Sequence, residues 1–262
     1  MLTRRVSMRI RYAARTDLGM RRTHNEDCFG ILEDEALVLV ADGMGGHAAG
    51  EVASALATAA VGSFYHETHA RTPRAWPFEC QAQLTLLEKR LVCGFKLANQ
   101  RIFEASNSET GRRGMGTTLV AAAIDGDRIC ISHVGDSRAY RIRDGTIERL
   151  TRDHSLLEQF KEINPEMTRE EEDRFPHKNV ITRALGLNDF VEVDVKTLDL
   201  RAGDVYLLCS DGLSGHVPDE EMLELTDGDD SVEHTVAELV ERANDSGGND
   251  NITLVMLKCI PK

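Results

Sequence analysis

The chain has 262 residues, of which 44 are acidic and 31 basic, and its formal net charge at pH 7 is −13. This charge argues against general binding of nucleic acids or anionic membranes, because both require a basic surface. The length is sufficient to bury a large apolar core without disulfides. The basic residues near the start are not followed by the apolar run of a signal peptide, and no stretch reaches transmembrane length. We therefore expect a soluble cytoplasmic protein.

The six cysteines show no spacing typical of a metal site. Cys130, Cys209 and Cys259 lie within apolar strand patterns, and we expect all six to be small apolar side chains in a reducing compartment. The chain also lacks an internal repeat and a linker rich in proline, glycine and serine. We therefore predict a single domain over residues 1–262.

The first half of the chain alternates strand and helix patterns. Residues 36–40 form an apolar strand pattern, and a glycine-rich turn follows at 43–47. The alanine-rich segment 52–64 and the segment 84–102 carry apolar residues spaced by three and four, which predicts two amphipathic helices. Both helices must cover a sheet.

The second half begins with short strands. Residues 117–150 contain apolar strands joined by Asp125-Gly126 and Asp144-Gly145, which predicts a β-meander. Residues 152–178 break this pattern and predict a helical excursion with solvated charges. Further strands are predicted at 191–200, 205–210 and 252–257, with one helix after 218–219 and another at 232–243. Strands with helices outside them predict an α+β fold, a four-layer α-β-β-α sandwich of two antiparallel sheets with outer helices.

Four aspartates lie at the ends of predicted strands, far apart in the sequence. Asp42, Asp136 and Asp211 follow an apolar strand, while Asp250 precedes the last one. Strand ends can meet at one edge of a sheet, and buried carboxylates repel one another unless a cation lies between them. Mg²⁺ and Mn²⁺ take oxygen ligands of this kind. The four aspartates therefore predict a divalent-metal site, although a single Asp-Gly pair after a strand is more often an ordinary turn.

Six short polar motifs stand between about Arg11 and Leu257. In order they are Asp17-Leu18-Gly19-Met20-Arg21-Arg22-Thr23-His24-Asn25-Glu26-Asp27, Asp42-Gly43-Met44-Gly45-Gly46-His47, Gly116-Thr117-Thr118, Val134-Gly135-Asp136-Ser137-Arg138-Ala139-Tyr140, Ser210-Asp211-Gly212 and Gly248-Asn249-Asp250-Asn251. Together they resemble the metal-dependent protein phosphatases of type 2C in their compact bacterial form. One such motif is weak, but six in the family's order are very specific.

The resemblance implies a site for two core ions, Mn²⁺ or Mg²⁺. Asp42 would bridge the two ions, and the Gly43 carbonyl with the carboxylates of Asp211 and Asp250 would complete the protein ligands. A bridging position needs a carboxylate, because its two oxygens can satisfy both ions. Asp136 would hold a third, weaker ion.

The resemblance also assigns residues around the phosphate. Glu26 and Asp27 would orient a metal-bound water, and Arg22 would clamp the phosphate. An arginine suits this role because its planar group offers paired donors and stays charged. Arg21 beside it competes for the same role. The segment 152–178 corresponds to the family's flap.

Two roles stay open. Animal relatives carry a histidine after Asp-Gly that is proposed to protonate the leaving group, whereas this chain has Met44 there and His47 three residues later. His47 could serve as this general acid, since histidine titrates near neutrality, but a capping or structural role is the alternative. Asn179 could lend its backbone carbonyl to the third ion.

By this resemblance the chain would hydrolyse phosphoserine and phosphothreonine in proteins by a metal-bound water, opposing a bacterial Ser/Thr protein kinase. Two cations ~3.5–4 Å apart can generate the nucleophile and neutralise the phosphoryl oxygens together. The expected partners are phosphoproteins, including such a kinase and its substrates. We expect a monomer with no nucleic-acid or membrane partner.

Two other classes of function are alternatives. A non-catalytic scaffold or sensor would be expected to have lost a metal acid, and none is lost here. A small-molecule phosphatase or nucleotidase would use the same metals; a lidded cleft would favour it, and an open cleft would favour protein substrates. No cysteine lies in a glycine-rich anion-binding loop and no Walker loop is present, which argues against a cysteine phosphatase and nucleotide-driven transfer.

Overall fold

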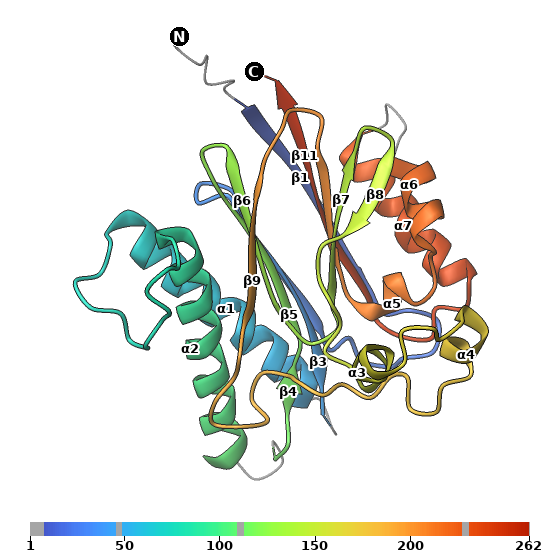
Figure 1. Cartoon of the computed structure of the whole chain (residues 1–262), viewed down its shortest axis with the longest axis horizontal. Helices are drawn as coiled ribbons and strands as arrows, with labels where there is room; N and C mark the ends of the chain where they lie inside the picture. Colours follow the sequence, from blue (N-terminus) through green and yellow to red (C-terminus); the bar gives the residue numbers. More distant parts are fainter. Residues whose placement is uncertain (1–7, 46–48, 109–112, 227–230, 262) are drawn as a thin grey trace.

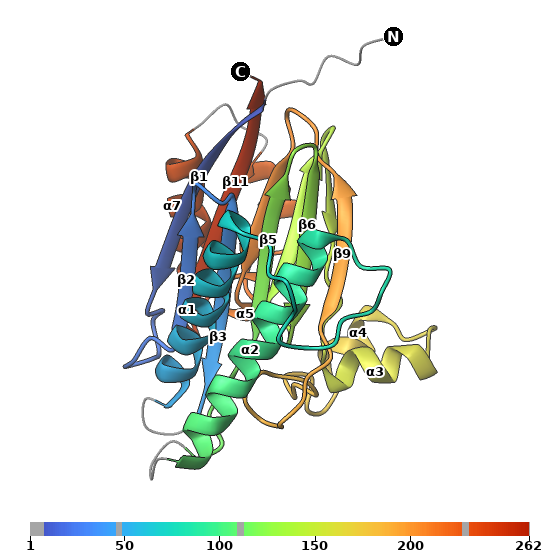
Figure 2. The same cartoon turned by 90° about the vertical axis from the view of Figure 1, so that its left-hand side faces the viewer.

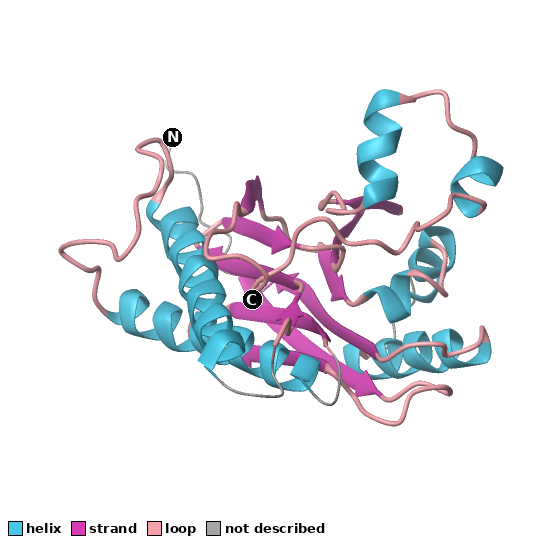
Figure 3. Cartoon of the chain, turned by 90° about the horizontal axis from the view of Figure 1, so that it is seen from below, coloured by secondary structure: helices cyan, strands magenta, loops and turns pink. Residues whose placement is uncertain are grey.

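Two antiparallel sheets face each other, and helices cover the outer face of each sheet (Figure 1). The computed structural model describes residues 8–45, 49–108, 113–226 and 231–261. Seen from below, the strands run between two groups of helices (Figure 3). The predicted α+β sandwich of four layers is confirmed.

The first sheet joins the two ends of the chain. Its strands run in the order β1 (Met8–Asp17), β11 (Ile252–Pro261), β10 (Val205–Cys209), β7 (Arg138–Arg143) and β8 (Thr146–Arg149), with every neighbouring pair antiparallel. β1 pairs with β11 along its whole length, from Met8 opposite Pro261 to Asp17 opposite Ile252. The motif after β1 therefore lies next to the motif before β11.

The second sheet carries the Asp42 strand next to its edge strand. Its order is β2 (Asp27–Leu32), β3 (Leu37–Met44), β5 (Leu119–Asp125), β6 (Arg128–Val134) and β9 (Asp194–Asp199), and β4 (Gly116–Thr117) pairs with the end of β3. The sequence placed Asp42 after its strand, at the start of a turn. In the structure β3 continues through Gly43 to Met44, because this end still has β4 as a hydrogen-bonding partner.

The predicted meander over residues 117–150 is corrected to two hairpins in different sheets. β5 and β6 pair in the second sheet, whereas β7 and β8 pair in the first. The chain crosses between the sheets at residues 135–137, where Gly135 adopts a φ of 104° that favours glycine. A strand's apolar alternation is the same in either sheet, so the sequence pattern could not reveal this crossing. The crossing places Asp136 between the two sheets.

Apolar residues fill three layers. On β3, Val38 and Val40 belong to the core between the sheets, while Leu37 and Leu39 belong to the core beneath the helices. A third core lies between β10, β11 and the helices on the other side. This alternation along a strand is the period of two that buries both faces of a sheet.

Helices α1 (Ala49–Ala70) and α2 (Leu86–Ser108) cover the second sheet (Figure 2), and α6 (Asp219–Thr226) and α7 (Val232–Asp245) cover the first. The helix predicted from residue 84 begins at Leu86 instead, because Thr85 caps it. The Glu88 amide donates to Thr85 Oγ1 at 3.3 Å, and the Thr85 amide donates to Glu88 Oε2 at 2.8 Å. None of the described helices combines the length and apolar composition needed to cross a membrane.

The segment 152–178 leaves the sandwich as two short helices, α3 (Leu156–Ile163) and α4 (Arg169–Asp173), which confirms the predicted helical excursion. Its two ends are held together by a bridge between Ser155 and Ile181 and by a 2.7 Å bond from the Thr182 amide to the His154 carbonyl. The chain then stays irregular until β9. The strand predicted from residue 191 therefore begins only at Asp194.

Candidate active site

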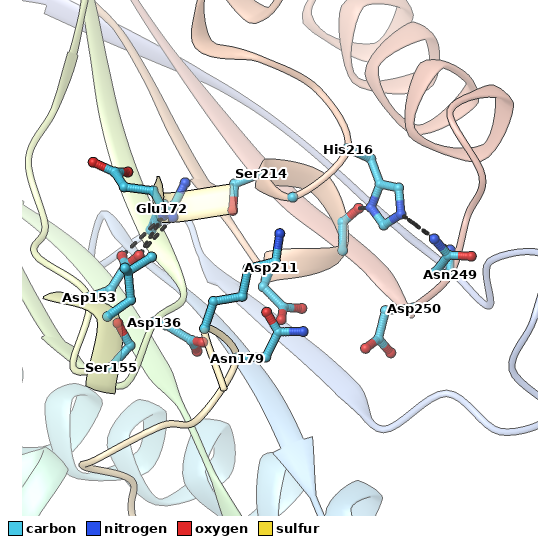
Figure 4. Close-up of a pocket in the computed structure, with 15 residues that line it drawn as sticks. Asp136, Asp153, Ser155, Glu172, Asn179, Asp211, Ser214, His216, Asn249 and Asp250 are labelled. Atoms are coloured by element: carbon cyan, nitrogen blue, oxygen red, sulfur yellow. Dashed lines mark hydrogen bonds and ion pairs between the residues drawn. The ribbon is translucent and has the colours of Figure 1, made fainter. Parts of the chain in front are cut away.

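The structure brings the four predicted aspartates together at one end of the sandwich. Asp136, Asp211 and Asp250 line a cleft of about 440 Å³ (Figure 4). Asp42 lies close enough that the charges of these three raise its pKa, in addition to the larger effect of burial. The four residues come from both sheets, so the cleft depends on the packing of one sheet against the other.

Asp27 is the fifth carboxylate of this cluster. It lies opposite Asp42 in the pairing of β2 with β3, and it is 9% exposed. Its Oδ2 accepts a 2.8 Å hydrogen bond from the Ser210 hydroxyl, which comes from the other sheet. Burial, together with the charges of Asp211 and Asp250, raises the pKa of Asp27 to about 7.

The cluster is electrostatically unfavourable without a cation. Burial and neighbouring carboxylates raise the pKa of Asp136 to about 7, and they raise that of Asp211 as well. Among the described residues, the buried atoms Asp27 Oδ1 and Asp211 Oδ1 have no hydrogen-bond partner. Oxygen-rich clusters with unpaired, buried acceptors fit hard divalent cations, which relieve this repulsion. The residues present therefore fit Mn²⁺ or Mg²⁺.

Arg22 forms an ion pair with Asp250, one of the residues that line the cleft. Arg22 Nη2 lies 2.6 Å from Asp250 Oδ2, and the side chains are 47% and 35% exposed. The loop before them turns at Gly19, with a φ of 75°, where a Cβ would lie 2.1 Å from the Asp250 carbonyl oxygen. Only glycine permits this approach. The arginine therefore stands at the carboxylate cluster with part of its surface open to solvent.

Glu26 is fixed at the beginning of α1. Its carboxylate accepts a hydrogen bond from the Gly50 amide, and a Cβ on Gly50 would lie 2.7 Å from Glu26 Cδ. The helix start also favours a negative charge there. The Glu26 carbonyl accepts a hydrogen bond from the Gly43 amide at 3.1 Å. This bond fixes the backbone of Glu26 against the end of β3.

Neutral residues to which the motifs assigned no role hold the backbone at Asp42 and Glu26 in place. Thr118 Oγ1 accepts from the Asp42 amide at 3.1 Å, and Thr117 Oγ1 donates to the Asp42 carbonyl at 2.8 Å. The Asn251 side chain accepts from the Glu26 amide at 2.8 Å and donates to the Leu18 carbonyl at 3.0 Å. These residues lie inside the quoted motifs, which was the available signal.

His216 joins the two loops that carry Asp211 and Asp250. Its Nδ1 donates to the Gly212 carbonyl at 2.9 Å, and its Nε2 accepts from Asn249 Nδ2 at 3.2 Å (Figure 4). This residue could not be predicted from the sequence, because a single histidine outside the motifs carries no signal. It acts as a bridge between the short helix α5 (Asp211–Ser214) and the strand that follows Asp250.

The structure describes Asn179 and Arg21 but not His47. Asn179 is exposed and lines the same cleft as Asp136 (Figure 4). His47 lies outside the described residues. Arg21 is exposed, and within the described part of the chain it makes no ion pair. The geometry therefore favours Arg22 over Arg21 as the arginine at the carboxylates.

A second group of possible ligands lies at the base of the flap. His133, His154 and Asp194 each offer one possible ligand atom. These three atoms lie within 4.8 Å of one another. Arg183 Nη1 lies 2.6 Å from Asp194 Oδ1 and 3.0 Å from His154 Nε2. The guanidinium already supplies the positive charge there. We therefore interpret this group as a structural link between flap and sheet.

The comparison with known families agrees with the motifs. Residues 20–256 match the family model of protein phosphatase 2C. The chain belongs to this family. A serine/threonine phosphatase of Listeria monocytogenes, Stp, is 38% identical over 247 residues, which cover 93% of this chain and 94% of that protein.

Solved structures of other members of the family have the same fold. The serine/threonine phosphatase PstP of Mycobacterium tuberculosis has a TM-score of 0.82 and 38% identity, covering 97% of this chain and 99% of that one. The catalytic domain of PstP, solved in complex with two manganese ions, has a TM-score of 0.81 and 37% identity, covering 97% and 100%. A metal-containing relative therefore shares the fold over nearly all of this protein phosphatase 2C chain.

Proposed function

We propose that this protein hydrolyses phosphoserine and phosphothreonine in proteins with Mn²⁺ or Mg²⁺ as cofactor. The observation that carries the proposal is the cluster of carboxylates at Asp27, Asp42, Asp136, Asp211 and Asp250, in which two buried oxygens have no partner among the described residues. Its place in a family whose members include named serine/threonine phosphatases supports the substrate class.

Asp42, the Gly43 carbonyl, Asp211 and Asp250 are proposed to hold two core ions, with Asp42 bridging both. Asp42 suits the bridging role, because the charges of Asp27, Asp211, Asp136 and Asp250 all act on it. Asp136 is proposed to hold a third ion, with Asn179 beside it in the cleft. When bound, the cations supply an activated water and charge for the phosphoryl oxygens.

The remaining residues are proposed to orient the reactants. Arg22 contacts Asp250, which lines the cleft, and its paired donors could bind two phosphate oxygens while Asp250 keeps the guanidinium in place. Glu26, fixed at the α1 start, and Asp27, fixed by Ser210, can each accept a proton or hydrogen bond from water. His47 remains a candidate for protonating the leaving group.

Phosphoproteins are proposed as the partners, including a bacterial Ser/Thr kinase and that kinase's substrates. We further propose that residues 1–262 form one catalytic domain that acts as a monomer in the cytoplasm. The relatives' names support the phosphoprotein class. The pairing of the first strand with the last supports a single domain, because neither half of the chain would then form the first sheet alone.

The substrate class can be tested by direct competition. With Mn²⁺ present, we expect phosphoserine and phosphothreonine peptides to be hydrolysed, tyrosine phosphate on proteins to be a poorer substrate, and EDTA to stop all turnover. The measurement is phosphate release at equal concentrations of peptide and nucleotide. Nucleotide hydrolysis far faster than that of any peptide would instead indicate a small-molecule phosphatase. Full turnover in excess EDTA would exclude the proposed metal chemistry.

Arg22→Ala should raise KM for a phosphopeptide about tenfold or more, because a charged hydrogen bond contributes about 1.5–3 kcal/mol. A fall in kcat as well would show that its bonds strengthen in the transition state. Arg21→Ala is the matched control, since both arginines are exposed and adjacent. Steady-state kinetics of both variants decide the assignment. A larger effect from Arg21→Ala would reverse it.

A further inference from the structure

Two cysteines meet where the loop after α1 reaches α2. Cys80 Sγ and Cys93 Sγ lie 3.0 Å apart, and both are free thiols. Cys80 is half-buried on the loop, whereas Cys93 is fully buried on α2. A disulfide bond is about 2.05 Å long, so bond formation requires the two sulfurs to approach by about 1 Å.

The other cysteines have no such partner. Cys130, Cys209 and Cys259 are buried in strands, and Cys28 Sγ lies 3.3 Å from the Thr58 hydroxyl. Within the described residues, which include all six cysteines, only the Cys80 and Cys93 sulfurs are in contact. The expectation that every cysteine is merely a small apolar side chain is therefore incomplete for this pair.

We propose that Cys80 and Cys93 are a reversible dithiol–disulfide modification site, oxidised by a small-molecule disulfide such as oxidised glutathione. The Cys80 thiolate attacks one sulfur of the reagent, which forms a mixed disulfide and releases one glutathione thiolate. The Cys93 thiolate then attacks the Cys80 sulfur and releases the second. Two protein thiols are oxidised, one glutathione disulfide is reduced to two thiols, and the two thiol protons pass to the released thiolates.

The surroundings set the order of these steps. Burial and the neighbouring Cys80 raise the pKa of Cys93 to about 12, so Cys93 is the poorer first nucleophile. Cys80 has the exposed surface that a reagent needs. Lys96 stands one turn beyond Cys93 and donates from Nζ to the Glu79 carbonyl at 2.8 Å, which holds the loop beside the pair. Its charge also favours the Cys93 thiolate.

The loop that carries Cys80 is one wall of a second cavity of about 200 Å³. Phe78 and Glu79 line it from the loop, Lys96 and Asn99 from α2, and residues 189–191 from the segment after the flap. This loop lies beside α2, and in Figure 1 it lies on the opposite side of the molecule from α3 and α5. The disulfide would fix the loop to α2 at this wall.

The same helix holds the chain that returns from the flap. Asn99 accepts from the Gly186 amide at 2.8 Å and donates to the Asn188 carbonyl at 3.0 Å. After oxidation, α2 would therefore be bonded to the loop through the disulfide and to the returning segment through the hydrogen bonds of Asn99.

The test is a redox titration of the full chain in glutathione buffers, followed by alkylation and non-reducing peptide mapping. We expect the free thiols measured after denaturation to fall from six to four, with one linked peptide that joins Cys80 to Cys93. Dithiothreitol should restore all six. A Cys80–glutathione adduct that persists in the native chain, a link involving Cys28, or six free thiols in oxidised glutathione alone would each overturn the proposal.

Single variants test the order of attack. Cys93→Ala should accumulate the mixed disulfide at Cys80, and Cys80→Ser should take up no glutathione at Cys93. Cys28→Ala is the matched control, because Cys28 is also half-buried, and it should leave the link unchanged. Glutathione found on Cys93 of Cys80→Ser would contradict Cys80 as the first nucleophile. Cys80→Ser alters a half-buried loop residue, so the variant should fold. The peptide map of the unchanged protein tests the disulfide without any variant.

Discussion

Asp42→Asn should lower kcat for a phosphopeptide by more than about a hundredfold. Loss of a residue that merely supports a metal ligand costs 10–100-fold, and Asp42 is proposed to bind both core ions itself. Asp136→Asn should cost less, because Asp136 is proposed to hold only the third ion. The measurement is kcat and KM over a range of Mn²⁺ concentrations, with Mn²⁺ affinity measured by calorimetry.

The control is Asp144→Asn. Asp144 lies in the hairpin turn between β7 and β8 with a φ of 51°, a conformation that asparagine adopts readily. The Asp144→Asn substitution removes the same charge as Asp42→Asn but at a distance from the cleft. The activity of this variant should therefore equal that of the unchanged protein. Equal losses for Asp42→Asn and Asp136→Asn would contradict the proposed difference between core and third ions.

The strands and helices of this fold could be predicted because each buries a periodic apolar face. The spacing of residues 84–102 predicted α2, and Asp125-Gly126 is the turn between β5 and β6. The assignment of strands to sheets could not be predicted. The alternation on β7 is equally compatible with either sheet, and the crossing at Gly135 depends on packing that no local pattern encodes.

The carboxylates of the site could be predicted for a different reason. Asp42 and Asp211 are costly in a core unless a cation is present, so acids after apolar strands are a visible anomaly. Thr118, Asn251 and His216 are not anomalous in this sense, since neutral polar side chains occur throughout a sequence. Their roles depend on hydrogen bonds between segments that are distant in the sequence. The chemical roles of the acids stay predictions until they are measured.

Raising the pH should destabilise the protein when its divalent cations are removed. The pKa values of Asp27 and Asp136 are about 7 in the folded chain, against an ordinary value of 3.8. The folded state therefore binds more protons than the unfolded state between about pH 4 and 7. The free energy of unfolding falls as the pH rises through this range. The stabilisation is complete below about pH 4 and is lost as the pH passes about 7.

The expected size of this effect is large. One pKa unit corresponds to about 1.4 kcal/mol, so a shift of roughly three units is on the order of 4 kcal/mol for one group taken alone. The two aspartates belong to one cluster, and their contributions are not additive. His133 acts in the opposite direction, because burial lowers its pKa, and its contribution fades about one pH unit above its ordinary value of 6.5. Comparison of about pH 6.5 with about pH 8 keeps the histidine contribution small, and over this interval the carboxylate effect is on the order of 1 kcal/mol for one group.

The measurement is the urea midpoint at these two pH values, in EDTA and in saturating Mn²⁺. In EDTA the midpoint should fall at the higher pH. In Mn²⁺ the fall should shrink or reverse, because the cation binds the deprotonated carboxylates and competes with protons. Asp136→Asn should reduce the fall in EDTA, since one titrating group is gone, whereas Asp144→Asn should retain it. A midpoint in EDTA that rises with pH would show that burial and neighbouring charges do not raise the pKa values of these carboxylates in the folded chain, and the electrostatic reason for a metal at this cleft would be lost.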